Sequence, residues 1–179
     1  MDYSTKYDSP VGGLTLASDG ENLTGLWLDG QKYHAATIKN GLEERADLPV
    51  FQLARAWLDR YFAGGNPPID ALPLSPSGSE FRQKVWRILC QIPYGTCITY
   101  GDIAKEIAGQ DGIPRVSAQA VGGAVGHNPI SIIIPCHRVV GSTGSLTGYA
   151  GGIDKKIWLL NHEGMDMQGL FIPVKGTAL

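Results

Sequence analysis

The alternation of apolar and polar residues in the first third of the chain predicts a small sheet followed by one helix. Three strand-like runs are present: Asp2–Asp8, Leu14–Ser18 and Leu23–Leu28. The dipeptides Asp19-Gly20 and Asp29-Gly30 are typical of tight turns between or after such strands, so the pattern indicates an antiparallel meander. Residues 48–62 then place apolar side chains at helical spacing, and Gly64-Gly65 ends this predicted helix.

The second part of the chain has helical periodicity. Residues 66–78 contain four prolines and form the natural boundary between two units. Helices are predicted from Ser79 to about Cys90, over Tyr100–Ala108 with Thr99 as cap, from Ser117 to about Val125, and over Ile153–Glu163. The second and third of these, joined by residues 109–114, have the outline of a helix-turn-helix.

The predicted fold class is therefore an α/β (α+β) protein of two domains. Residues 1–75 form an N-terminal α/β domain with a small antiparallel sheet. Residues 76–179 form a mainly α, winged helix-turn-helix-like domain that carries the active site. In the second helix of the predicted helix-turn-helix, Gly122 and Gly123 indicate either a surface that a partner approaches closely or tight packing on a neighbouring helix.

The strongest chemical signal is the run Ile134-Pro135-Cys136-His137-Arg138-Val139. Residues 130–134 read as a short buried strand, which Pro135 ends because proline has no N–H for a strand ladder. A thiolate is the nucleophilic form of cysteine, so an imidazole and a fixed cation next to Cys136 favour a reactive thiol. Against this, a lone cysteine is commonly a small buried apolar residue, and adjacent side chains on a strand point to opposite faces.

Composition and charge narrow the class of protein. The chain has 179 residues and a net charge of -2, and its three cysteines have no disulfide-framework or zinc-site spacing. It contains no apolar stretch long enough to span a bilayer, and its N-terminus lacks the apolar core of a signal peptide, so we expect a cytoplasmic protein without membrane contact. Residues 1–75 carry 10 acidic and 6 basic residues, whereas residues 76–179 carry 7 and 9, which makes the second part the better partner for a polyanion.

Several motifs together resemble the O6-alkylguanine-DNA alkyltransferases (methylated-DNA–protein-cysteine methyltransferases). The resemblance covers about Ser79 to Gly164, and more loosely the N-terminal part. It is carried, in order, by Asn128-Pro129, by the run around Cys136, by Gly148-Tyr149-Ala150-Gly151-Gly152 and by Trp158-Leu159-Leu160-Asn161-His162-Glu163.

The resemblance implies a methylated-DNA–[protein]-cysteine S-methyltransferase. Such a protein moves the alkyl group from O6 of guanine in double-stranded DNA to Cys136, without a cofactor or metal, and is spent after one event. Whether O4-alkylthymine is also a substrate stays open. The resemblance further implies a monomer. The second helix of its helix-turn-helix enters the minor groove, and the target nucleotide is flipped out of the duplex.

The resemblance also assigns roles around the thiol. It implies that His137 takes the proton of Cys136, that Glu163 orients the imidazole, and that Asn128 fixes the turn beneath the site. From the residues alone, Glu163 could equally be a solvated carboxylate at a helix end, and Asn128 could be an ordinary turn residue.

On the substrate side, the resemblance assigns Tyr100 to the target nucleotide, and residues 146–151, with Tyr149, Ala150 and Gly151, to the wall of the guanine pocket. From the residues alone, Tyr100 could equally be a core aromatic at a helix start, and Tyr149 could simply pack.

Two positions depart from the family pattern. Gln119 stands where the family commonly has an arginine that fills the gap left by the flipped base, so we expect weaker stabilisation of the extruded nucleotide. Arg115, about one helical turn earlier, either compensates in part or contacts phosphate or solvent. Ala150 replaces a hydroxyl residue found in some members, which leaves backbone N–H groups to bind near guanine O6.

Two other functions are compatible with parts of the pattern. A helix-turn-helix module that recognises lesions in DNA without transferring the alkyl group is the main alternative. A Cys-His thiol hydrolase is a third reading, and it would turn over many times. The strand-like residues 170–172 near the C-terminus have no role in any of these readings.

Overall fold

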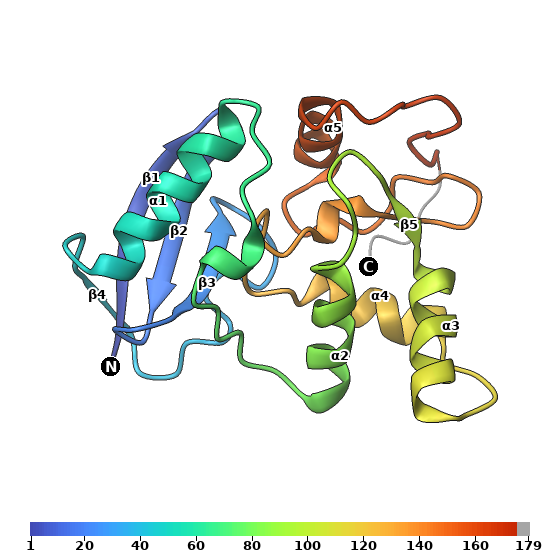
Figure 1. The fold of residues 1–179 in the computed structure, drawn as a ribbon, viewed down its shortest axis with the longest axis horizontal. Coiled ribbons are helices and arrows are strands. Elements are labelled where there is room, and N and C mark those ends of the chain that lie inside the picture. The colour runs from blue at the N-terminus through green and yellow to red at the C-terminus, as the bar shows by residue number, and fades with distance from the viewer. Residues whose placement is uncertain (175–179) are drawn as a thin grey trace. The chain divides into compact units, whose positions relative to one another are not determined.

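A computed structural model describes residues 1–174; residues 175–179, the end of the predicted second domain, lie outside the described residues. The chain forms two compact units. Unit 1 comprises Met1–Gly78 together with Pro129–Ile133, and unit 2 comprises Ser79–Asn128 together with the chain from Ile134 onward. The elements of both units are labelled in Figure 1.

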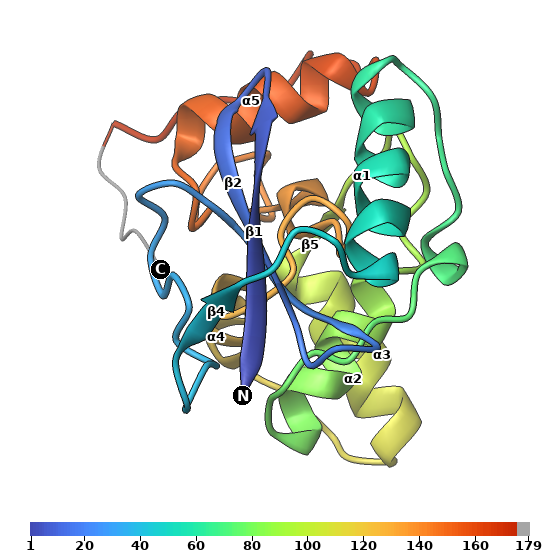
Figure 2. The same cartoon turned by 90° about the vertical axis from the view of Figure 1, so that its left-hand side faces the viewer.

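Unit 1 is built on a four-stranded sheet in the order β3-β2-β1-β4. Its strands are β1 (Asp2–Ser9), β2 (Gly12–Ser18), β3 (Leu23–Leu28) and β4 (Leu42–Glu44). The first three form the predicted antiparallel meander, in which Tyr7 pairs with Leu14 and Leu16 with Leu26. Strand β4 was not predicted; it lies beside β1 and runs parallel to it, so the sheet is mixed rather than purely antiparallel (Figure 2).

Helix α1 (Pro49–Phe62) covers one face of this sheet (Figures 1 and 2). The helix buries the apolar stripe expected from its periodicity, which consists of Val50, Phe51, Ala54, Trp57, Leu58 and Tyr61. Leu14 and Leu16 of β2 and Leu26 and Leu28 of β3 are fully buried. A short 3-10 turn (Ile69–Ala71) follows in the proline-rich segment.

The predicted strand over residues 130–134 is wrong. Only Ile130 pairs with β3, where the Leu26 N–H donates to Pro129 O at 2.8 Å and the Ser131 N–H donates to Leu26 O at 2.9 Å. The next residues form turns, and Ile132 has a φ of 70°, in the left-handed region that β-branched residues rarely adopt. These residues are apolar because they are buried, and a buried strand would have the same sequence pattern.

Unit 2 contains four helices among the described residues: α2 (Glu80–Leu89), α3 (Tyr100–Asp111), α4 (Ala118–Gly126) and α5 (Ile153–His162). The oxygens of Ser79, Thr99 and Ser117 accept the backbone N–H groups that cap the first three, as predicted. Helix α3 is three residues longer than predicted and ends at Gly112, whose φ is 64°.

Helix α4 packs against both α2 and α3, and the Trp86 indole N–H donates to Ala124 O at 2.9 Å. Two short parallel strands, β5 (Ile98–Thr99) and β6 (Val139–Val140), join the start of α3 to the chain that follows Cys136. In the described part of the chain, no helix combines the length and apolar character needed to cross a membrane.

Candidate functional site

Cys136 begins a single 3-10 turn, Cys136–Arg138, which leads directly into β6. Its N–H donates to Ile134 O at 2.8 Å, and the Arg138 N–H donates to Pro135 O at 3.0 Å. The thiol is thus presented by a hydrogen-bonded turn and not, as predicted, by the end of a strand. Cys136 is 5% exposed and His137 is fully buried.

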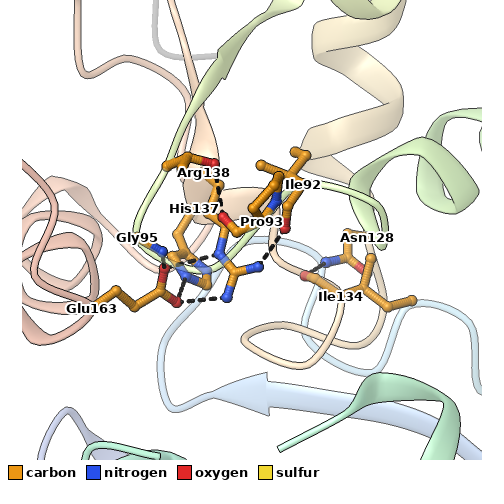
Figure 3. A network of polar contacts seen from close by, with 9 residues as sticks. Ile92, Pro93, Gly95, Asn128, Ile134, His137, Arg138 and Glu163 are labelled. Carbon is orange, nitrogen blue, oxygen red and sulfur yellow. Dashed lines mark hydrogen bonds and ion pairs between the residues drawn. The ribbon is translucent and has the colours of Figure 1, made fainter. Parts of the chain in front are cut away.

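The carboxylate of Glu163, just after the last turn of α5, is the centre of a buried polar network (Figure 3). It accepts hydrogen bonds from His137 Nε2 at 2.7 Å, from Arg138 Nε at 2.8 Å and Nη2 at 2.9 Å, and from the Gly95 N–H at 3.2 Å. Although burial alone would raise the pKa of Glu163, the hydrogen bonds from His137 and Arg138 hold it well below its usual range. Glu163 is therefore ionised, and it is no solvated helix-end carboxylate.

This network determines which nitrogen of His137 carries the proton. Because the Glu163 carboxylate is an acceptor, His137 Nε2 must be the donor, and the lone pair of a neutral ring then lies on Nδ1. Burial lowers the pKa of His137 despite the opposing effect of Glu163, so the ring is neutral near pH 7. His137 Nδ1 is buried and has no hydrogen-bond partner among the described residues, which leaves it available as a base.

The thiol of Cys136 rests in its protonated form. Burial raises its pKa, while a hydrogen bond from the Asn128 side chain and the charge of Lys156 act in the opposite direction. Asn128 Nδ2 also donates to Ile134 O at 2.8 Å and thereby holds the turn before Cys136 (Figure 3). The structure thus brings the predicted residues Cys136, His137, Glu163 and Asn128 together in one buried cluster.

Arg138 was interpreted from the sequence as a cation beside the thiol, and its actual contacts are different. The guanidinium binds both Glu163 oxygens and donates through Nη1 to Ile92 O at 2.7 Å. Its charge therefore neutralises Glu163 and not a thiolate. No local sequence pattern predicts this pairing, because Arg138 and Glu163 lie on different elements 25 positions apart.

Lys156 is a further buried residue at this site that the sequence analysis missed. It is fully buried on α5, and Nζ donates to Val139 O at 2.5 Å and to Thr147 O at 3.0 Å. Burial lowers its pKa to about 8. A signal was present: Lys156 lies three and four positions before Leu159 and Leu160, on the apolar stripe of its helix, where an unpaired charge is costly.

The loop between β6 and α5 adds two tyrosines near the thiol. Tyr100 is 8% exposed, and its hydroxyl donates to Thr147 O at 3.0 Å. Tyr149 is buried, lies edge-on to His137 with 6.5 Å between ring centroids, and has a hydroxyl without a partner among the described residues. Burial is the main reason that the pKa of each phenol is raised, and the neighbouring Cys136 adds to it. Ala150 and Gly151 follow in the loop and are half-buried.

Gln119 and Arg115 lie on exposed surface and not in this buried cluster. On α4, Ala118 and Ala120 are exposed as well, whereas Gly122 is buried. Of the two glycines, Gly122 is buried, whereas a Cβ atom added at Gly123 would meet nothing within 4 Å.

A groove of about 300 Å³ runs between α3 and the start of α4, with Lys105 and Arg115 among its lining residues. Within residues 1–174, no group of three or more His, Cys, Asp or Glu side chains is placed to hold a metal ion.

Models of known protein families match segments in both units of the chain. Residues 80–165 match the family model of the 6-O-methylguanine DNA methyltransferase DNA-binding domain, and residues 3–76 match that of its ribonuclease-like domain.

Individual relatives agree with these matches. The chain is 44% identical over 161 residues to a methylated-DNA–protein-cysteine methyltransferase of Haemophilus influenzae, covering 90% of this chain and 86% of the relative. It is 46% identical over 156 residues to the Mycobacterium tuberculosis protein of the same name, with coverage of 87% and 88%. A crystal structure of Mycobacterium tuberculosis OGT in complex with DNA superimposes with a TM-score of 0.76 at 43% identity, covering 90% of this chain and 92% of that one.

Proposed function

The chain belongs to the 6-O-methylguanine DNA methyltransferase family, and we propose that it repairs O6-alkylguanine in duplex DNA by taking the alkyl group onto Cys136. Its function is DNA repair by alkyl transfer, and its partner is DNA. The observation that supports the assignment of the nucleophile is the buried thiol of Cys136 next to a neutral histidine anchored on Glu163.

The transfer begins with a proton. His137 Nδ1 accepts the proton of the Cys136 thiol, directly or through a water molecule, and the thiolate so formed attacks the alkyl carbon. The new S–C bond forms as the C–O6 bond breaks, and the electron pair of that bond stays on guanine. Guanine takes up one proton in exchange for the one that Cys136 has lost, so the charges balance.

Glu163 and Arg138 act through His137. The carboxylate fixes the imidazole so that Nδ1 is the basic nitrogen, and it stabilises the imidazolium that forms when the proton arrives. Arg138 holds the carboxylate in place with two hydrogen bonds. Both are positioning residues, because neither contacts the reacting atoms.

Other residues receive the base. Tyr100 donates its hydroxyl to the flipped guanine and exchanges its present partner, Thr147 O, for the base. Tyr149 forms a wall of the pocket, and backbone N–H groups at Ala150 and Gly151 bind the O6 edge. Asn128 keeps the turn under Cys136 in place and lowers the pKa of its thiol.

The exposed start of α4 makes the contact with the duplex. Small side chains there allow the helix to enter the minor groove of the DNA, and Gln119 occupies the gap left by the flipped nucleotide. Arg115, which lines the protein groove between α3 and α4, contacts phosphate. A base inside a duplex cannot reach a thiol that is 5% exposed, so extrusion of the nucleotide is a requirement of the geometry. The protein acts as a monomer in the cytoplasm.

The reaction is a single event for each protein molecule. A thioether is not hydrolysed by any group at this site, so Cys136 is not regenerated. Intact-protein mass spectrometry after incubation with a duplex that contains O6-methylguanine tests this. We expect one added methyl group per molecule, mapped to Cys136 and absent in Cys136→Ser.

The same experiment separates the alternatives. A lesion that stays bound without any change in protein mass would indicate a recognition module that transfers nothing. Release of more than one methyl equivalent per protein molecule would indicate a hydrolase. Methylation at Cys90 or Cys97 would overturn the assignment of the nucleophile while leaving the transfer itself in place.

A further inference from the structure

The chain after α5 turns back along the loop that precedes α5, and we refer to residues 165–171 as the tail strap (Figure 1). Gly164, with a φ of 71°, ends the helix, and the Met165 N–H donates to Leu160 O at 3.0 Å. Further along, the Gln168 N–H donates to the Asp166 carboxylate at 2.9 Å, and the Leu170 N–H donates to Met167 O at 3.1 Å. These turns give the strap a defined path.

The strap is joined to the loop by a pair of backbone hydrogen bonds. The Phe171 N–H donates to Gly144 O at 3.1 Å, and the Leu146 N–H donates to Phe171 O at 2.9 Å. The two segments also approach closely, because a Cβ atom added at Gly144 would lie 2.2 Å from Gly169 O. Only a glycine at position 144 therefore permits this pairing in its present form.

Apolar contacts strengthen the attachment. Leu146 is 2% exposed and belongs to a buried cluster with Val140 and Leu160. Met165, Met167 and Leu170 of the strap are partly buried and pack on this cluster. The Phe171 side chain, in contrast, is 46% exposed, so this residue holds the loop through its backbone.

The attached residues lie next to the reacting centre. Leu146 is followed by Thr147, whose carbonyl oxygen accepts both the Tyr100 hydroxyl and Lys156 Nζ. The loop is thus held by the strap just before Thr147 and by two side chains at Thr147 itself. Tyr149, which lies edge-on to His137, comes two residues later.

We propose that the tail strap is a positioning element for alkyl transfer, which fixes residues 144–146 so that residues 147–151 hold their shape around the base. This rests on the proposed function for the identity of the base, whereas the attachment of strap to loop does not depend on it. A displacement of about 1 Å in the bound geometry can lower a reaction rate by about 100-fold. A protein in which the strap no longer holds residues 144–146 should therefore transfer the alkyl group slowly.

Two pairs of variants test the proposal. A chain ending at Gln168 lacks Phe171 but keeps Met165 and Met167 in their cluster, and a chain ending at Ile172 is its control. The substitution Phe171→Pro removes the exposed ring and the N–H that donates to Gly144 O. Phe171→Ala removes the same ring and keeps that N–H, so the difference between the two variants reports on the N–H.

We measure the single-turnover rate of methyl transfer from a duplex containing O6-methylguanine, the affinity for the same duplex without the lesion, and hydrogen exchange of residues 144–151. We expect the 1–168 chain to react at least about 10-fold more slowly and Phe171→Pro several-fold more slowly, with fast exchange at Leu146 in the 1–168 chain. The 1–172 chain and Phe171→Ala should match the full chain. Affinity for undamaged DNA should stay within about twofold in all of them, because α4 is untouched.

Equal transfer rates and equal exchange in the full chain, the 1–168 chain and Phe171→Pro would overturn the proposal. If the 1–168 chain does not fold, the Phe171→Pro and Phe171→Ala pair decides by itself. Failure of the proposed function is a separate result: the full chain would not gain a methyl group, while hydrogen exchange would still report whether the strap protects Leu146.

Discussion

The cluster around Cys136 and the exposed start of α4 satisfy their polar groups in opposite ways. In the cluster, Glu163 accepts four hydrogen bonds from protein groups, and its partners His137 and Arg138 are buried. At the start of α4, Gln119 and the neighbouring Arg115 are exposed. The charged groups of the first region are paired within the protein, whereas those of the second face solvent.

The two regions should therefore respond differently to ionic strength. Charges enclosed in protein are little screened by salt, so the proton-transfer network should work in the same way at low and high ionic strength. An exposed cation that binds DNA releases counterions, so the affinity for the duplex should fall as the salt concentration rises. Variants in the two regions should therefore separate rate and stability from affinity.

The substitution Glu163→Gln should have the largest effect, because it leaves the Arg138 charge buried without its partner. We expect a loss of about 3–5 kcal/mol in the free energy of unfolding, measured by urea denaturation. The single-turnover rate should fall by about 100-fold, since His137 loses the negative charge that stabilises its imidazolium form.

Two controls define this result. Glu80 is exposed and forms an ion pair with Lys84 one helical turn away, and Glu80→Gln should change stability by less than about 0.5 kcal/mol. In the double variant Glu163→Gln with Arg138→Met, stability should recover in part while the rate stays low. A full recovery of the rate would show that Glu163 serves only to neutralise Arg138.

The pH dependence of stability should show an intermediate effect. The pKa values of His137 and Glu163 in the fold lie below their ordinary values of 6.5 and 4.5. As the pH falls through these ordinary values, the unfolded chain binds protons that the folded chain does not, so stability is complete above about pH 6.5 and is lost in two stages below it.

Urea midpoints between pH 8 and pH 4 measure this loss. The second stage should be smaller in Glu163→Gln, which has no carboxylate to protonate at that position. A stability that is constant from pH 8 to pH 5 would contradict the neutral state of His137.

Exposed residues near the start of α4 should give the smallest effects. Arg115→Ala should weaken duplex binding a few-fold and reduce the slope of log K against log salt by about 1, without a change in the transfer rate at saturating protein. Arg60→Ala, an exposed charge on α1 of unit 1, is the matched control and should leave both quantities unchanged.

Gln119→Arg should act in the opposite direction to Arg115→Ala. It adds a cation where the flipped nucleotide leaves a gap, so both affinity and repair rate should rise. Unchanged values of both would show that Gln119 does not limit the stability of the extruded state.

The parts of the fold that were predicted from the sequence are those set by local interactions. The caps Ser79, Thr99 and Ser117 each bind backbone N–H groups within three residues, so the signal lies next to the structure that it specifies. Strand β4 has only three residues and no apolar alternation, and it forms because β1 offers a free edge. No local pattern predicts such a pairing.

The residues of the candidate site also fall into those indicated by local sequence and those that only the fold brings together. Cys136 and His137 are adjacent in the chain, and their residue types alone left two readings open, a reactive thiol and a small buried apolar residue. The role of Glu163 came from the family resemblance, and its second partner, Arg138, became visible only when the fold brought α5 beside the 3-10 turn. Lys156 was not among the predicted site residues, although its place on the apolar stripe of α5 was a signal for burial.

The return of residues 129–133 to unit 1 bears on how the protein is made. A ribosome releases the strands of unit 1 first, but the segment that pairs with β3 through Leu26 follows α2, α3 and α4. Unit 1 is therefore completed only after most of the helices of unit 2 have been synthesised, and the residues that complete it lie immediately before the turn that carries Cys136. During translation, the residues that complete the first unit therefore emerge immediately before Cys136.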